Sequence, residues 1–352
     1  KGARWHEARG ILSDMRRRLL EPDIVSWNAA VGACRGNGQW LLALGMLSEM
    51  RPHRLQPDII TYTSAITAVG SAVRWHEALI VLSDMRDRQL DPVAITYDAA
   101  LTACEKSAQW PEACGLIRDM RMRRTEPVTI TYNAVISACG KGARWDLALD
   151  MFSDMNSRRL DPDTITCNAG ISACEKGVQW QEALHVFSEM HQQVIEPNVI
   201  TFSAAISACE KGARWHEARG ILSDMRRRLL EPDIVSWNAA VGACRGNGQW
   251  LLALGMLSEM RPHRLQPDII TYTSAITAVG SAVRWHEALI VLSDMRDRQL
   301  DPVAITYDAA LTACEKSAQW PEACGLIRDM RMRRTEPVTI TYNAVISACE
   351  KS

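Results

Sequence analysis

The sequence has no apolar run that approaches the roughly 20 residues needed to span a bilayer, so we expect no transmembrane segment and no membrane partner. The sequence also has no excess of positive charge, because its 40 Lys and Arg residues are balanced by 41 Asp and Glu residues and the formal net charge is -1. Proteins that bind nucleic acid usually carry a basic balance. Total charge therefore gives no indication of RNA binding, and only the placement of the basic residues can do so.

Metal-binding motifs are missing as well. There is no C-x-x-C pair and no pair of histidines at metal-ligand spacing, which predicts no metal and no cofactor. The histidines have no recurring nucleophile or carboxylate partner, so we expect no enzyme active site. Most of the cysteines share one position of a repeat, about one repeat or more apart. We expect buried free thiols in a reducing compartment, because residues so far apart along a stack of repeats cannot meet. These cysteines are Cys34, Cys104, Cys139, Cys174, Cys209, Cys244, Cys314 and Cys349.

A period of 35 residues runs through the whole chain. Tryptophan recurs at this spacing without a slip, and a Met and a Pro follow each Trp at fixed distances, so every repeat has the same frame. The tryptophans are Trp5, Trp40, Trp75, Trp110, Trp145, Trp180, Trp215, Trp250, Trp285 and Trp320. The full repeats are residues 24–58, 59–93, 94–128, 129–163, 164–198, 199–233, 234–268, 269–303 and 304–338, and partial repeats cover 1–23 and 339–352.

Each repeat carries two helical patterns, as residues 199–233 illustrate. The first begins near Thr201, a suitable N-cap, and ends at Gly212. The second begins near Trp215, has apolar residues at three- and four-residue spacing, and is stopped by Pro232. A single hairpin cannot bury both of its faces, so neighbouring hairpins must stack. The sequence therefore predicts an all-α fold, an α-solenoid superhelix of about ten helix-turn-helix repeats.

Part of the chain is an identical copy of another part. Residues 1–139 recur unchanged as residues 211–349, an offset of 210 residues. Natural drift would blur such a copy, so it indicates either a very recent duplication or an engineered one. The chain begins and ends within a repeat, and no capping helix with a polar outer face is visible. We therefore expect either a longer array or a chain that stacks end to end with itself.

The repeat has a recognisable pattern. Residues 130–163 read ITYNAVISACGKGARWDLALDMFSDMNSRRLDPD. A 35-residue unit with I-T-Y-N near its start, A-L and a late Met in its second helix, and a closing x-P-D resembles the P-type units of the pentatricopeptide repeat family. The tetratricopeptide alternative has a W-x-x-L-G-x-x-Y signature, which is absent. Two features depart from the family: a Trp opens each second helix, and Val and Asp occupy some positions expected to read bases.

The resemblance implies a protein that binds single-stranded RNA in a mitochondrion or plastid, with one base per repeat, although no transit peptide is visible. It implies that the first helices line a groove and that the second residue of each unit sandwiches a base. The alternative is plain core packing of a β-branched residue at a helix start. The second residues are Val25, Ile60, Ile95, Ile130, Ile165, Ile200, Val235, Ile270, Ile305 and Ile340.

The fifth residue of each unit, which the resemblance implies hydrogen-bonds the base, is polar in every repeat. Asn, Asp, Ser and Thr are poor choices inside a helix unless their side chains have a partner. A residue that merely faced water would be Glu, Lys or Gln in some repeats, and none occurs, so we favour recognition. The fifth residues are Asn28, Thr63, Asp98, Asn133, Asn168, Ser203, Asn238, Thr273, Asp308 and Asn343.

The last residue of each unit helps to select the base in the resembled family, and its alternative role is that of a turn residue after Pro. The last residues are Asp58, Val93, Val128, Asp163, Asn198, Asp233, Asp268, Val303 and Val338. With the fifth residue, the family rule pairs Asn-Asp with U, Asn-Asn with C and Ser-Asp with G. Repeats that end in Val lack a polar reader and should be weakly selective or silent. The implied preference, in repeat order, is U-N-N-U-C-G-U-N-N.

Lysine is confined to one position of the repeat. The chain has seven lysines and every one is the thirteenth residue of its unit, whereas all other basic residues are Arg or His. A cation at a helix C-terminus is favoured by the helix dipole, but that would accept Arg equally. We therefore favour contacts with phosphate along the groove rim, offset in part by the flanking acids Glu105 and Glu210. The lysines are Lys1, Lys106, Lys141, Lys176, Lys211, Lys316 and Lys351.

The tryptophans could instead stack on bases, as aromatic residues do in other single-strand binders. Because they open the second helix, which by the resemblance faces away from the groove, packing between repeats is the favoured interpretation. Two functions remain open. One is an RNA-binding array in organellar RNA metabolism. The other is a scaffold for other proteins, or a structural subunit of an organellar ribosome or another large complex, with little sequence-specific reading of RNA.

Overall fold

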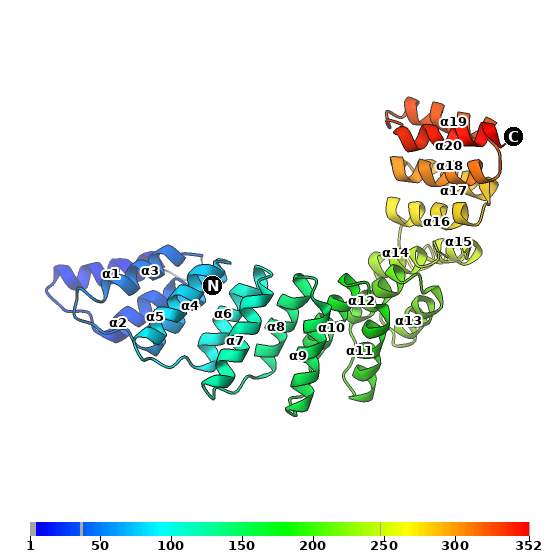
Figure 1. Cartoon of the computed structure of the whole chain (residues 1–352). Helices are drawn as coiled ribbons and strands as arrows, with labels where there is room; N and C mark the ends of the chain where they lie inside the picture. The colour runs from blue at the N-terminus through cyan, green and yellow to red at the C-terminus, as the bar shows by residue number, and fades with distance from the viewer. Residues whose placement is uncertain (1–4, 36–37, 247, 352) are drawn as a thin grey trace. The chain divides into compact units, whose positions relative to one another are not determined.

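We describe the protein from a computed structural model that covers residues 5–35, 38–246 and 248–351. The chain divides into two compact units, residues 1–177 (unit 1) and 178–352 (unit 2), which are described separately. Within the described residues all regular secondary structure is helical, and twenty α-helices form hairpins that follow one another along the chain (Figure 1). The predicted all-α fold of about ten helix-turn-helix repeats is therefore confirmed.

In unit 1, second helices of the repeats alternate with first helices. The second helices begin at a Trp, and they are α1 (Trp5–Arg17), α3 (Trp40–Glu49), α5 (Trp75–Asp87), α7 (Trp110–Met122) and α9 (Trp145–Ser157). The first helices are α2 (Ile24–Ala33), α4 (Ile59–Ser71), α6 (Ala94–Lys106), α8 (Thr129–Lys141) and α10 (Thr164–Lys176).

Unit 2 continues the same alternation. Its second helices are α11 (Trp180–Gln192), α13 (Trp215–Arg227), α15 (Trp250–Glu259), α17 (Trp285–Asp297) and α19 (Trp320–Met332). Its first helices are α12 (Val199–Lys211), α14 (Ile234–Gly242), α16 (Ile269–Ser281), α18 (Ala304–Lys316) and α20 (Thr339–Glu350).

Within each unit the helices form two layers. Each first helix packs directly on the next first helix, as α4 does on α6 and α16 does on α18. Each second helix lies against the first helix of its own repeat and that of the following repeat. Among the described residues, no second helix packs directly on another second helix. The first helices therefore form one continuous layer whose outer side carries the second and fifth residues of successive repeats.

The last residue of a repeat is the N-cap of the following first helix. Asn198 caps α12 by accepting a hydrogen bond from the backbone N–H of Thr201 at 3.0 Å, and the Thr201 hydroxyl accepts one from the Asn198 N–H at 3.1 Å. The prediction that Thr201 is the N-cap is therefore wrong by three residues. Thr201 does take part in the capping box, but as its third helical residue, and Asn198 is the N-cap. The helix ends with Gly212 as its C-cap, as predicted.

The second helix α13 begins at Trp215 as predicted but ends at Arg227, well before Pro232. The reason lies in the backbone of Leu229, which has a left-handed φ of 60° and takes the chain out of the helix before the proline is reached. The prediction that Pro232 stops the helix is therefore corrected: a left-handed residue ends it and the proline only follows.

Tryptophan at the start of the second helix packs between repeats, which confirms that interpretation. The Arg144 guanidinium lies 4.4 Å from the ring centroid of Trp110, one repeat earlier, and Arg214 lies over Trp180 at the same distance. A Cβ atom at Gly142 would be 2.4 Å from Cδ1 of Trp110. Glycine at this position therefore lets the indole lie against the turn of the next repeat, where the arginine adds a cation–π contact.

The cysteines that share one repeat position are buried, except for the exposed Cys349, and all eleven cysteines are free thiols. The expectation that cysteines cannot meet concerned only these eight. Cys139 does contact a cysteine at a different repeat position, because its Sγ lies 3.8 Å from Sγ of Cys114. Cys114 belongs to the second helix of the preceding repeat, which is the helix that packs against α8. The prediction considered only cysteines at one repeat position and so overlooked this contact between different positions.

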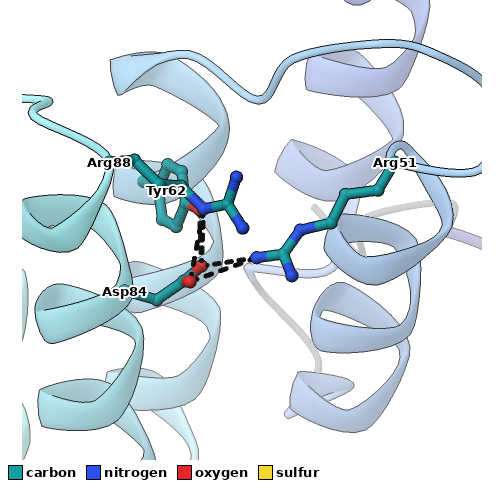
Figure 2. Close-up of polar contacts among 4 residues, drawn as sticks. All are labelled: Arg51, Tyr62, Asp84 and Arg88. Carbon is teal, nitrogen blue, oxygen red and sulfur yellow. Dashed lines mark hydrogen bonds and ion pairs between the residues drawn. The ribbon is translucent and has the colours of Figure 1, made fainter.

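A cluster of polar side chains joins neighbouring repeats on the side of the second helices. Figure 2 shows Asp84 of α5 accepting hydrogen bonds from the hydroxyl of Tyr62 (2.6 Å), from Arg51 of the preceding repeat (2.8 Å) and from Arg88 (3.2 Å). Burial and the bond to Asp84 together raise the pKa of Tyr62 to about 12. Burial alone would raise the pKa of Asp84, but the hydroxyl and both guanidinium groups outweigh it and lower that pKa.

We refer to this Tyr-Asp-Arg arrangement as the polar clamp, and it recurs with Tyr272, Asp294 and Arg261 in unit 2. Where the fourth residue is Tyr, the clamp fastens the repeat to the one before it, independently of the residues that resemble base readers. None of the described helices is long and apolar enough to cross a membrane.

Candidate nucleic-acid interface

The second residue of every repeat is exposed, although it is always Val or Ile. The exposed fraction of these side chains ranges from 54% for Val235 to 70% for Ile340. Core packing, the alternative considered from the sequence, is therefore wrong. A regular row of exposed β-branched side chains lies along the first-helix layer, and each presents an apolar surface to whatever occupies the groove.

The fifth and last residues of the Asn-Asp repeats are joined by hydrogen bonds. In unit 1, Asn28 Nδ2 donates to both carboxylate oxygens of Asp58 at 3.2 Å, and Asn133 Nδ2 donates to Asp163 at 3.2 and 3.3 Å. In unit 2 the pair Asn238 and Asp268 repeats this geometry at 3.2 Å. The two positions are 30 residues apart in sequence but form one half-buried polar group.

The third residue of the next repeat completes this group, and the sequence reasoning missed it. The Thr61 hydroxyl donates to Asn28 Oδ1 at 2.5 Å, and Thr166 and Thr271 do the same to the Asn of their preceding repeat. The carbonyl of the Asn is therefore held by the hydroxyl, and its NH2 group turns towards the carboxylate. The signal was available, because a hydroxyl occurs at this position in every repeat: Ser26, Thr61, Thr96, Thr131, Thr166, Thr201, Ser236, Thr271, Thr306 and Thr341.

The same network leaves one carboxylate oxygen available. Asp163 Oδ1 accepts from the Thr166 backbone N–H and hydroxyl, both at 2.8 Å, and from Asn133. Asp163 Oδ2 accepts only from Asn133 among the described residues. Burial alone would raise the pKa of Asp163, but the bonds from Thr166 and Asn133 outweigh it and lower the pKa. The group therefore presents an ionised acceptor, Oδ2, beside an amide donor.

Repeats with other residue pairs keep the hydroxyl contact but lose this donor and acceptor pair. Thr63 is hydrogen-bonded to the Thr96 hydroxyl at 2.7 Å. Asp98 Oδ1 accepts from the Thr131 hydroxyl at 2.8 Å, and burial raises the pKa of Asp98 more than this bond lowers it. Ser203 lies 2.8 Å from the Ser236 hydroxyl and donates weakly to Asp233 at 3.4 Å.

Val93 and Val128, the last residues of two such repeats, are N-caps whose own side chains make no hydrogen bond to the following helix. The same holds for their copies Val303 and Val338. The remaining pair of predicted readers, Asn168 and Asn198, lies in two different units, and each residue is described only within its own.

A hollow lies between two successive first helices of unit 2. It has a volume of about 260 Å³ between α18 and α20. The residues that line it include the fifth residues Asp308 and Asn343, the exposed Ile340, and the polar side chains Thr312, Glu315 and Ser347. The fifth residue of one repeat and the second residue of the next therefore line one hollow.

Five of the predicted phosphate-binding lysines fall into two groups. Lys141 forms an ion pair with Glu105 of the preceding repeat at 2.9 Å, and Lys351 pairs with Glu315 at 2.8 Å. Lys106, Lys176 and Lys316 follow repeats with Gly at the position of that Glu, and they have no ion pair in the described part of the chain. Lys1 lies outside the described residues. Glu105 and Glu315 form their ion pairs with the lysine of the next repeat.

No group of three or more His, Cys, Asp or Glu side chains is placed to hold a metal ion in the described ranges. The groove can instead offer apolar contacts, amide and hydroxyl donors and carboxylate acceptors, which are the groups that recognise the edges and faces of unpaired bases.

Comparison with protein families finds matches along almost the whole chain. The description "PPR repeat family" matches residues 22–71, 127–176, 162–211 and 232–281. The description "Pentatricopeptide repeat domain" matches 80–142 and 290–352, and "PPR repeat" matches 60–90, 200–228 and 270–300. No curated protein is similar enough to the chain to count as a relative.

Solved structures with a similar fold include the pentatricopeptide repeat protein PPR10 from maize. That structure is 24% identical with a TM-score of 0.63 and is matched over 99% of this chain and 50% of its own. PPR10 in complex with an 18-nt psaJ RNA element is 19% identical with a TM-score of 0.67, over 98% of this chain and 55% of its own. The chain thus spans about half the length of these structures, and the likeness establishes the solenoid fold.

Proposed function

The chain belongs to the pentatricopeptide repeat family, and we propose that it binds single-stranded RNA with one base per repeat and catalyses no reaction. The observation that carries this proposal is the hydrogen-bonded Asn-Asp group, which recurs beside an exposed Val or Ile. If the Asn-Asp group served only the fold, its remaining donor and acceptor would not be expected beside an exposed apolar side chain.

The chemistry of the Asn-Asp group supports uracil as its partner. Asn133 has one amide hydrogen left after its bond to Asp163, and it can donate to a base carbonyl. Asp163 Oδ2 can accept the imino proton of the same base. Uracil and guanine both offer this combination of carbonyl and imino N–H, whereas cytosine and adenine present an acceptor where the carboxylate needs a donor. The family rule of U for Asn-Asp agrees with this reasoning.

The second residues provide the other half of each site. Ile130 and Ile165 are exposed on successive first helices, and a base placed between two such side chains would bury apolar surface on both of its faces. The hollow lined by Asp308 and Ile340 combines a polar and an apolar side chain, as this arrangement requires. We therefore keep the preference implied by the resemblance, U-N-N-U-C-G-U-N-N in repeat order, as the proposed reading pattern.

Phosphate contacts are assigned to lysines without an ion pair. Lys106, Lys176 and Lys316 would neutralise backbone phosphates, while Lys141 and Lys351 would first have to leave Glu105 and Glu315. Each phosphate contact adds to the salt dependence of binding. A chain with few available lysines should therefore bind with a shallow salt slope and owe more of its affinity to the bases.

PPR10 has been solved with an RNA element in its structure, which is consistent with this proposal for a chain of the same fold. By analogy with the family, the site of action would be a mitochondrion or plastid. The second candidate is a scaffold in a large organellar complex. The Lys141–Glu105 and Lys351–Glu315 ion pairs favour it, because they neutralise groups that an RNA binder would be expected to leave open.

Direct binding decides between the two. The protein is titrated with the labelled RNA UAAUCGUAA, in both polarities, and with a control in which every U is replaced by A. We expect binding to one polarity that weakens with salt, and weaker binding to the control by at least about tenfold, because three Asn-Asp sites lose their match. Equal binding to both RNAs, or none at low salt, would favour the scaffold.

A further inference from the structure

Two repeats combine an Asp at the fifth position with a Val at the last, and they differ chemically from all the others. In repeat 94–128, Thr131 donates to Oδ1 of Asp98 at 2.8 Å. In repeat 304–338, Thr341 donates to Oδ1 of Asp308 at the same distance. Within the described residues, no hydrogen bond reaches Oδ2 of either carboxylate. Each repeat therefore presents Oδ2 of its fifth residue as an acceptor that is not yet engaged.

The position of this acceptor matches that of the amide in the Asn-Asp repeats. Asp98 and Asn133 are both fifth residues, and each is fixed by the hydroxyl of the next repeat through Oδ1. The second atom of the side chain, Nδ2 in Asn133, is Oδ2 in Asp98. A hydrogen-bond donor is thus replaced by an acceptor at the equivalent position. A base that accepts a hydrogen bond from the Asn of an Asn repeat would here meet a second acceptor.

The neighbouring last residue cannot correct this. Val128 and Val338 carry no polar group, so neither a donor nor a second acceptor is available from that side. In unit 2 the hollow beside Asp308 is also lined by Glu315, which already accepts from Lys351 and Ser347, and by Asn343, the fifth residue of the next repeat. The site therefore favours a ligand that supplies hydrogen-bond donors.

The four bases differ in the donors that they offer. A carboxylate accepts only, and it is best satisfied by two adjacent N–H groups. Guanine has them, since N1–H and an N2–H lie side by side on its Watson–Crick edge. Adenine and cytosine have a single amino group next to a ring nitrogen that would repel the carboxylate. Uracil has one N–H between two carbonyl oxygens, and both of these would face the acceptor.

We propose that repeats 94–128 and 304–338 select guanine through Asp98 and Asp308, so that the reading pattern becomes U-N-G-U-C-G-U-N-G. This inference rests on the proposed function, because it assumes one base per repeat in the groove. It assigns a ligand to two repeats that would otherwise be silent, and it uses the fifth residue alone.

The test compares RNAs that differ only at the third and ninth bases. Four RNAs of the form UAXUCGUAX, in the polarity that binds, carry G, A, C or U at both X positions. We expect guanine to bind best, by at least about fivefold per site over uracil, with adenine and cytosine between them. Changing the second and eighth bases, which face the Thr-Val repeats, is the matched control and should change the affinity less.

The variant D98N/D308N removes the acceptor and retains the size of the side chain. It should lose the preference for guanine while binding the remaining seven bases as before. Equal affinity for all four RNAs, or a guanine preference that persists in the variant, would overturn the inference and leave the proposed function standing. Absence of binding to every RNA would overturn both. Circular dichroism of the variant checks that the helices are retained.

Discussion

The repeats that end in Asp and the repeats that end in Val organise their polar groups differently, even where, as in 129–163 and 94–128, both helices of the repeat are 13 residues long. In repeat 129–163, Asp163 both caps α10 and holds Asn133. In repeat 94–128, Val128 caps α8 without a side-chain bond, and Asp98 is held only by Thr131. One residue thus serves helix stability and the groove at the same time in the first class, and neither in the second.

This difference indicates that the fold tolerates the loss of the cap. The polar clamp is present in both classes, since Tyr97 and Tyr132 each donate to an Asp of the second helix in their own repeat. The stacking of Arg on Trp also occurs in both, at Arg74 on Trp40 and at Arg144 on Trp110. Stability is therefore distributed over contacts on the second-helix side, and the groove side is left open to variation.

The largest effect is expected from converting one class into the other at Asp163. D163V removes the acceptor that would meet the imino proton of uracil, and we expect the preference for U over C at the fourth base to fall by about tenfold or more. D163N is the matched control, because Asn caps α12 in this same chain at Asn198.

With Oδ1 still accepting from Thr166, D163N would place an NH2 group where Oδ2 lies now. It should therefore reverse the preference from U towards C without loss of the cap. Competition binding with RNAs that differ only at the fourth base measures both variants. An unchanged U preference in both would show that Asp163 contributes to the helix and not to base selection.

A smaller effect, on stability, is expected from restoring the cap in the Val class. V93D should raise the free energy of unfolding by about 1 kcal/mol, because Asp at an N-cap accepts bonds that Val cannot accept. V128D should gain less or even lose stability, since the new carboxylate would face Asp98 as Asp163 now faces Asn133.

V128N provides the neutral control for this pair, since it offers the cap without the second negative charge. Urea unfolding of the three variants at neutral pH measures the order V93D and V128N above V128D. Equal gains in all three would mean that the fifth and last residues do not come into contact in the Val class.

The smallest difference between classes is expected at the polar clamp, which they share. Y97F and Y132F should each cost about 1 kcal/mol of stability and leave base selection unchanged. Burial and the bond to Asp119 raise the pKa of Tyr97 to about 12, from an ordinary value of 10. Because the folded pKa is the higher one, this contribution is complete below about pH 10 and is lost as the pH rises towards 12.

The free energy of unfolding should therefore fall more steeply between pH 9 and pH 12 for the unmodified chain than for Y97F. A change in base preference on removal of either hydroxyl would contradict the separation of the clamp from the groove.

Much of this architecture could be predicted from the sequence, because the period fixes it. The start of α13 at Trp215 and the end of α12 at Gly212 follow from spacing and from residue type. The N-cap was misplaced to Thr201 because its hydroxyl is a good cap in isolation, and only the structure shows that Asn198 takes that role. The end of α13 depended on a left-handed Leu229, which no propensity predicts.

The repeat positions of the candidate interface could be predicted from the sequence, but the hydrogen bonds and ion pairs between repeats could not. The exposure of Ile340 and its neighbours excluded core packing, which the sequence had left open. The hydroxyl that fixes Asn28 comes from Thr61, 33 residues away, and a hydrogen bond between repeats has no signature within one repeat. The pairing of Lys141 with Glu105 was hidden for the same reason, since the two residues are 36 positions apart.

The polar group formed by Asn133, Asp163 and Thr166 straddles the border between two repeats. Anyone who grafts repeats from one array into another must choose where to cut. A crossover between the last residue of one unit and the first of the next would separate Thr166 from its partners and reassemble the group from two parents. A crossover just after Thr166, within the first helix, would transfer the group intact.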